Sequence, residues 1–114
     1  VYVHVEAPDE CGHRAELDNK ILSIEKIDSE ILSPVVAYLR NRKEDFRVMV
    51  LPDHPTPIRL RTHTINPVPF FIYASDLRFS GCQTFSEKSA AACRNYLPEG
   101  HRLMEFLTTD LLAK

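Results

Sequence analysis

The residues of this chain best suited to chemistry are carboxylates and imidazoles gathered in three short stretches. They are Asp9 and His13, the adjacent pair Asp53 and His54, and His63. Aspartate oxygen and histidine nitrogen hold Zn²⁺ or Mn²⁺, and such ions catalyse phosphoryl transfer. No serine or threonine stands in an obvious nucleophile setting. The pattern therefore predicts metal ligands for phosphoryl chemistry without the group that would be phosphorylated.

Each stretch is a weak signal by itself, and the combination is stronger. Asp9 and His13 are predicted on a loop, where Gly12 lets the backbone fold tightly so that both side chains reach one ion. Asp53 and His54 would point apart on an extended segment, which suits two neighbouring ions, or one ion and a residue that supports its ligands. An incidental turn aspartate or surface histidine explains any one of them equally well.

Apolar patterns predict the elements that position these residues. Val1–Val5 is predicted as a buried strand, and a helix with apolar residues at helical spacing is predicted from Asp18 to Asn41. Pro34 falls inside this helix and predicts a kink near Ser33. Phe46–Leu51 is predicted as a second strand.

A proline-containing loop over residues 52–67 precedes a third predicted strand, Val68–Tyr73. A capping-box pattern over residues 84–87 and Pro98 each predict the start of a later helix. The first strand–helix–strand unit predicts that strands one and two are parallel, with Asp9 and Asp53 at the same sheet edge. His63 reaches that edge only if strand three is antiparallel to the others.

Length and composition limit the classes of function. A length of 114 residues predicts one domain. The chain is 44% hydrophobic and 26% charged, and its net charge of −2 provides no basic field for nucleic acid or a membrane surface. Three widely spaced cysteines predict no disulfide framework and favour a reducing cytosol. A strand that begins at Val1 leads us to expect a fragment of a longer protein.

Five stretches of the chain resemble the cofactor-independent phosphoglycerate mutases of the archaeal type, in the alkaline phosphatase superfamily. The resemblance is carried by residues 5–13, 51–58, 61–64, 67–70 and 99–104. It covers nearly the whole chain but only the C-terminal part of that family. It implies an α/β fold of three α/β/α layers, with a partial mixed sheet in which strands one and two are parallel and strand three is antiparallel.

The resemblance also implies a role for each candidate residue. Asp9, His13 and His63 would ligate one divalent ion, and Asp53 and His54 a second. The ions would be Mn or Zn, with Co or Mg as further options, and no 2,3-bisphosphoglycerate would be required. In the family the second ion also takes an aspartate and a phosphorylated serine from the N-terminal region. Neither has a counterpart here, so the chain alone is expected to be inactive.

Four further residues are predicted around the ligands. Glu6 and Glu10 would support the ligating histidines, with a place in solvent as the alternative for Glu10. Arg59 and Arg61 would meet phosphate or pair with local carboxylates. The expected substrate of the full-length enzyme is phosphoglycerate, with no nucleic-acid or membrane partner and self-association through an exposed sheet edge. The alternatives are another two-metal phosphomutase or phosphatase, such as a phosphopentomutase-like enzyme, and a non-catalytic metal-binding or interaction module.

Overall fold

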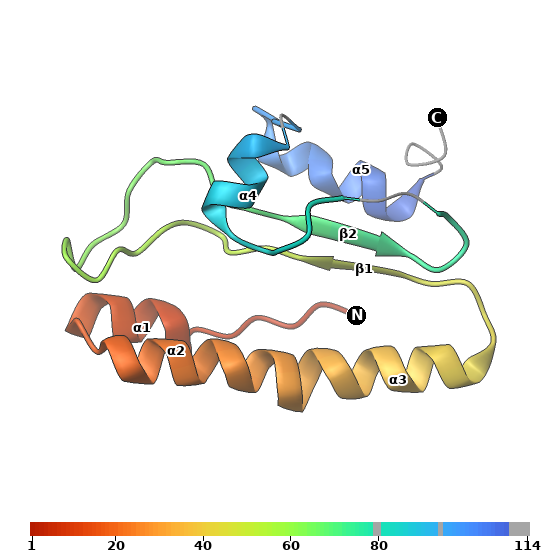
Figure 1. Ribbon diagram of the computed structural model, residues 1–114, viewed down its shortest axis with the longest axis horizontal. Coiled ribbons are helices and arrows are strands. Elements are labelled where there is room, and N and C mark those ends of the chain that lie inside the picture. The colour runs from red at the N-terminus through yellow and green to blue at the C-terminus, as the bar shows by residue number, and fades with distance from the viewer. Residues whose placement is uncertain (79–80, 94, 110–114) are drawn as a thin grey trace. The chain divides into compact units, whose positions relative to one another are not determined.

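The computed structural model describes residues 1–78, 81–93 and 95–109, which form helices and one antiparallel pair of strands (Figure 1). The chain separates into two compact units. Unit 1 comprises Val1–Glu44 and His54–Pro67, and unit 2 comprises Asp45–Asp53 and Val68–Lys114. The α/β class is therefore confirmed. None of the described helices is long and apolar enough to cross a membrane.

Unit 1 begins with an extended segment and a short helix. Val1–Val5 forms no strand, and Val1, Tyr2 and Val3 are exposed. The predicted first strand is not formed, because valine-rich sequence favours a strand only where a neighbouring strand completes its hydrogen bonds. Its parallel pairing with the second strand involves both units and stays a prediction.

Helix α1, Ala7–Arg14, replaces the loop that was predicted around Asp9 and His13. Pro8 lies in its first turn, where the missing N–H of proline leaves no intrahelical bond unmade. The helix ends at Ala15, which has a φ of 58°, and the N–H of Glu16 donates to the carbonyl of Cys11 at 2.9 Å.

The long helix of unit 1 is continuous but changes type along its length (Figure 1). Helix α2, Leu17–Lys26, passes into a π-helical segment η1, Ile27–Leu32, and then into α3, Ser33–Arg42. Proline at position 34 has no N–H to donate, so the regular hydrogen-bond pattern cannot pass through it. The irregularity predicted near Ser33 is this π-helical segment. The helix begins at Leu17, with Glu16 as its N-cap residue, and not at Asp18 as predicted.

Unit 2 is built on two strands whose antiparallel pairing was predicted. Strand β1 is Arg47–Val50 and strand β2 is Phe71–Ala74, with Arg47 opposite Ala74 and Val50 opposite Phe71. The N–H of Ser75 extends the pairing by donating to the carbonyl of Phe46 at 3.0 Å. Strand β2 starts three residues later than predicted, because Pro69 cannot donate to a ladder.

Short helices complete unit 2. Helix α4, Glu87–Ala92, is capped by Ser86, whose hydroxyl accepts from the N–H of Ser89, so the predicted capping box at Thr84 is displaced by two residues. A 3₁₀ turn η2, Gly100–Arg102, leads into α5, Leu103–Thr108. Ala74 and Leu103 are buried apolar residues among the described part of this unit, 4% and 7% exposed.

Cys82 and Cys93 are joined as a disulfide, with their Cα atoms 6.5 Å apart. The expectation of no disulfide was therefore wrong. Spacing along the chain did not show that the segment before α4 returns to the end of that helix, which places the two residues within the range a disulfide spans. Cys11 is a free thiol.

Candidate metal centre

Helix α1 supplies the first two candidate ligands from one face. Asp9 and His13 are four residues apart, so their side chains are neighbours on the helix surface. Oδ2 of Asp9 lies 3.4 Å from Nε2 of His13. The helix thus brings the two side chains together, whereas the sequence predicts that a tight loop does so.

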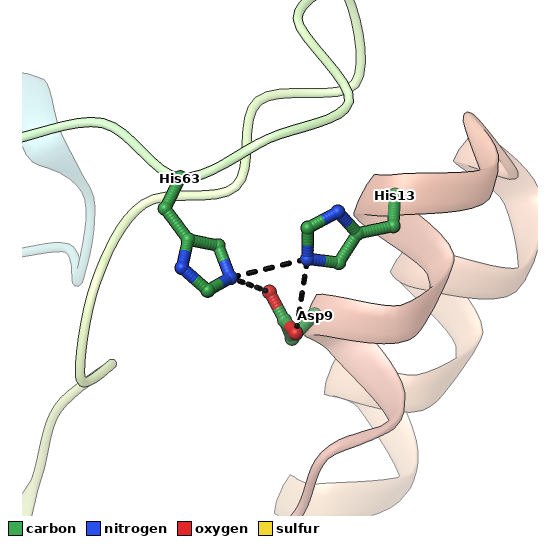
Figure 2. A group of neighbouring side chains, drawn as sticks. All are labelled: Asp9, His13 and His63. Carbon is green, nitrogen blue, oxygen red and sulfur yellow. Dashed lines mark hydrogen bonds and ion pairs between the residues drawn. The ribbon is translucent and has the colours of Figure 1, made fainter.

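The third ligand, His63, comes from a folded loop in the same unit. The N–H groups of Leu60 and Arg61 both donate to the carbonyl of Pro57 at 3.0 Å, and the N–H of Thr64 donates to that of Pro55 at 3.1 Å. These bonds turn the chain so that His63 faces α1 (Figure 2). Its Nε2 lies 3.2 Å from Oδ1 of Asp9 and 3.1 Å from Nε2 of His13.

The other nitrogen of His13 is fixed by the main chain. Nδ1 of His13 lies 2.9 Å from the carbonyl oxygen of Arg61. A carbonyl can only accept, so Nδ1 carries the proton of the neutral ring and Nε2 presents a lone pair. Metal-ligating histidines are commonly oriented in this way.

His54 lies beside the same residues. Its ring centroid is 3.6 Å from that of His63, and its Nδ1 is 4.0 Å from Oδ1 of Asp9. The structure thus brings together four of the five predicted ligands. The fifth, Asp53, is an exposed residue of unit 2. The predicted meeting of all five ligands at one sheet edge would involve both units, so it stays a prediction.

The carboxylate of Asp9 is held by Thr56. The buried hydroxyl of Thr56 donates a hydrogen bond to Oδ1 of Asp9. This hydrogen bond, aided by the nearby His13, His63 and His54, keeps the pKa of Asp9 below its usual value, although partial burial acts in the opposite direction. The ionised carboxylate that a cation requires is therefore the favoured form.

The donor set and its spacing fit a divalent cation. Ligand atoms of Asp9, His13 and His63 all lie within 4.8 Å of one another. Metal–ligand bonds of about 2.0–2.2 Å place neighbouring ligand atoms roughly 3–3.5 Å apart, and the three contacts described above fall in this range. Carboxylate oxygen with imidazole nitrogen suits Zn²⁺ and Mn²⁺. A cation at this point would satisfy converging lone pairs and a negative charge.

The four residues predicted around the ligands have different surroundings. The carbonyl of Glu6 accepts the N–H groups of Asp9 and Glu10 at the start of α1, and Glu10 pairs with Arg14 rather than with a histidine. Arg59 and Arg61 are exposed. Arg61 contributes its carbonyl oxygen to the site, while the predicted contact of its side chain with phosphate stays a prediction.

Two residues near the site were missed by the sequence analysis. Thr56 bonds to Asp9, and Lys20 donates from Nζ to the carbonyl of Thr56 at 2.6 Å. One signal was available for Thr56, a polar residue held between Pro55 and Pro57 directly after a predicted ligand. Nothing local marks Lys20, because its partner is 36 positions away.

Comparison with known proteins assigns the chain to a family. Residues 1–103 match the metalloenzyme superfamily, and the chain belongs to it. Divalent-metal binding is a property of this class, and the cluster of Asp9, His13 and His63 accords with it. No solved structure matches the chain.

Several curated relatives carry the same name. The chain is 47% identical over 90 residues to the 2,3-bisphosphoglycerate-independent phosphoglycerate mutase of Methanosarcina mazei, covering 78% of the chain and 23% of that protein. It is 49% identical over 90 residues to the enzyme of this name from Methanosarcina acetivorans, with the same coverage. A probable mutase of Geobacter sulfurreducens is 40% identical over 108 residues, or 94% of the chain and 27% of that protein. The chain thus spans about a quarter of the length of these relatives.

Proposed function

We propose that this chain provides the metal-binding part of a 2,3-bisphosphoglycerate-independent phosphoglycerate mutase. The full-length enzyme would interconvert 3-phosphoglycerate and 2-phosphoglycerate through a phosphoserine supplied from outside these 114 residues. The observation that carries the proposal is the convergence of Asp9, His13 and His63 in a chain similar to enzymes of that name. Residues 1–114 would form the C-terminal part of a three-layer, alkaline-phosphatase-like domain in a cytosolic enzyme.

Asp9, His13 and His63 would hold the first ion, and Asp53 and His54 would contribute to a second. In two-metal sites the ions lie about 3.5–4 Å apart and clamp the attacking and leaving oxygens of a phosphoryl displacement. The position of His54, 4.0 Å from Oδ1 of Asp9, supports a second ion beside the first. Mn²⁺ or Zn²⁺ suits the nitrogen-containing donor set best, with Co²⁺ and Mg²⁺ as further options.

The chain's own residues prepare the site before any ion binds. The Arg61 carbonyl keeps the proton on Nδ1 of His13, and the Thr56 hydroxyl stabilises ionised Asp9. Arg59 and Arg61 are exposed cations near His63 in sequence, and they would meet the phosphate of the substrate. Self-association through an exposed strand edge would accompany this function if the sheet is incomplete.

Two measurements test the proposal. Titration calorimetry of the chain with Mn²⁺ or Zn²⁺ should show one tight site, because only the first set has three ligands here, and His63→Ala should abolish it. His4→Ala is the matched control, since His4 is exposed and stacks on Tyr2 outside the site.

The full-length protein should convert 3-phosphoglycerate and lose this activity in His63→Ala. No turnover of 3-phosphoglycerate by the intact protein would defeat the assignment. Turnover of a pentose phosphate in its place would identify a related phosphomutase, and metal binding without any turnover would identify a non-catalytic module.

A further inference from the structure

We propose that Thr56 is a positioning residue that sets both Asp9 and His54 for metal binding, although it is not itself a ligand. The inference rests on the proposed metal site. It adds to that site a residue that is not one of the proposed ligands. Thr56 is 5% exposed, and its hydroxyl lies between the two side chains it would control.

The direction of each hydrogen bond follows from the groups present. An ionised carboxylate only accepts, so the single hydroxyl hydrogen of Thr56 goes to Oδ1 of Asp9. Nδ1 of His54 lies 3.3 Å from the same hydroxyl oxygen, which then has only lone pairs to offer. Nδ1 of His54 must therefore carry a proton and donate it. In the neutral ring this leaves Nε2 with the lone pair that a metal ion needs.

Thr56 is itself fixed from two helices. Its carbonyl accepts from Nζ of Lys20 on α2 at 2.6 Å, a charge-assisted hydrogen bond. On α1, Gly12 lies so close that an added Cβ would be 2.6 Å from the Thr56 carbonyl oxygen and 2.8 Å from its Cγ2. Pro55 and Pro57 restrict the backbone on both sides. The hydroxyl is thus positioned by the scaffold and does not depend on an ion.

This arrangement explains why a buried hydroxyl stands between two candidate ligands. One hydroxyl fixes the rotamer of Asp9 and, through the same oxygen, the tautomer of His54. Residues that orient metal ligands typically contribute 10–100-fold in metal affinity. The loss of this hydroxyl should therefore weaken metal binding without removing any ligand.

The test compares three variants of the 114-residue chain by calorimetric titration with Mn²⁺ and Zn²⁺. Thr56→Val keeps the side-chain shape and should weaken binding about 10–100-fold. Thr56→Ser keeps the hydroxyl and should restore affinity to within a few-fold of the unaltered chain. Thr64→Val is the matched control, because the buried hydroxyl of Thr64 has no hydrogen-bond partner among the described residues. Equal affinities for Thr56→Val and the unaltered chain would overturn the inference.

A second measurement needs no metal ion, and its deciding outcome comes from the unaltered chain. The ¹⁵N shifts of the His54 ring in the metal-free chain should show the proton on Nδ1, and Thr56→Val should change this tautomer population. A ring protonated on Nε2 in the unaltered chain would overturn the inference directly. If the unaltered chain bound neither Mn²⁺ nor Zn²⁺, the proposed function would fail, whereas the tautomer of His54 would still decide the role of Thr56.

Discussion

Nδ1 of His13 lies 2.9 Å from the carbonyl oxygen of Arg61, so the imidazole of a candidate metal ligand is oriented by the backbone of Arg61, whose side chain is expected to meet phosphate. Arg61 has a φ of 55°, in the left-handed region that non-glycine residues seldom occupy. Backbone strain of this kind persists where the surrounding structure requires it. The main chain at Arg61, and not only its guanidinium, therefore belongs to the site.

The two roles of Arg61 can be separated by substitution. Arg61→Gly removes the side chain but adopts the same φ without strain, so affinity for Mn²⁺ should change by no more than a few-fold. Valine opposes this φ, so Arg61→Val should move the carbonyl away from His13. The affinity for Mn²⁺ should then fall about 10-fold or more. Calorimetry on both variants checks this. Equal weakening by the two substitutions would mean that the side chain, not the backbone, matters for the metal.

Gly12→Ala should destabilise unit 1, although alanine is normally the better helix former. The new Cβ would lie 2.6 Å from the Thr56 carbonyl oxygen, so α1 or the loop must shift. We expect a loss of about 1–3 kcal/mol in the free energy of unfolding, measured by denaturant titration. Gly100→Ala is the control, because its Cβ would meet no described atom within 4 Å and its effect should stay within about 0.5 kcal/mol. A more stable Gly12→Ala variant would contradict the close contact.

The pKa of Asp9 should rise when the hydroxyl of Thr56 is removed. The hydrogen bond from Thr56 is the largest cause of the lowered pKa of Asp9. Since the folded-state pKa lies below the unfolded one, ionised Asp9 stabilises the fold above the unfolded pKa, and this contribution is lost as pH falls through the folded pKa. Carboxyl ¹³C titration of Thr56→Val and Thr56→Ser should show a raised pKa in the valine variant only.

Divalent metal should stabilise the chain by binding only the folded form. At a free Mn²⁺ or Zn²⁺ concentration 100 times the dissociation constant, the stabilisation is about 2.7 kcal/mol. The melting temperature should rise accordingly and return to its starting value after a chelator is added. His63→Ala should show no rise, while His4→Ala should behave as the unaltered chain does. A rise that persists in His63→Ala would place the metal elsewhere.

Thiol titration of the denatured chain under non-reducing conditions should give one reactive thiol, that of Cys11. Cys82 and Cys93 are joined, whereas Cys11 is free. After reduction the count should become three, the number of cysteines in the sequence. Three thiols before reduction would contradict the Cys82–Cys93 disulfide and favour the expectation from the sequence that the cysteines are unpaired.

The sequence predicts which side chains come together better than it predicts the elements that carry them. Asp9, His13 and His63 stand out by residue type, and the structure brings their side chains together. Gly12 indicates a loop, yet it lies in a helix and serves the close approach of Thr56, while Pro8 suits the first turn of that helix. A glycine therefore supports either local structure until its tertiary partner is known.

Elements that depend on partners distant in sequence account for the other differences. Val1–Val5 has the composition of a strand but pairs with no described segment, whereas β1 and β2 pair with each other in the predicted antiparallel sense. Lys20 looks like an ordinary charge on a helix and meets Thr56 through a contact 36 positions away. Periodicity describes the faces of an element, but only the folded chain shows what each face meets.

The helical placement of Asp9 and His13 also limits how this stretch can change in length. Each residue of an α-helix turns the chain by about 100°, so one residue inserted between them would swing His13 away from Asp9. The loop between His54 and His63 has no such periodicity, but hydrogen bonds fix it too. The N–H of Thr64 closes its ends by donating to the carbonyl of Pro55, and the N–H groups of Leu60 and Arg61 form its turn by donating to the carbonyl of Pro57. Natural variation in length should therefore be absent between Asp9 and His13.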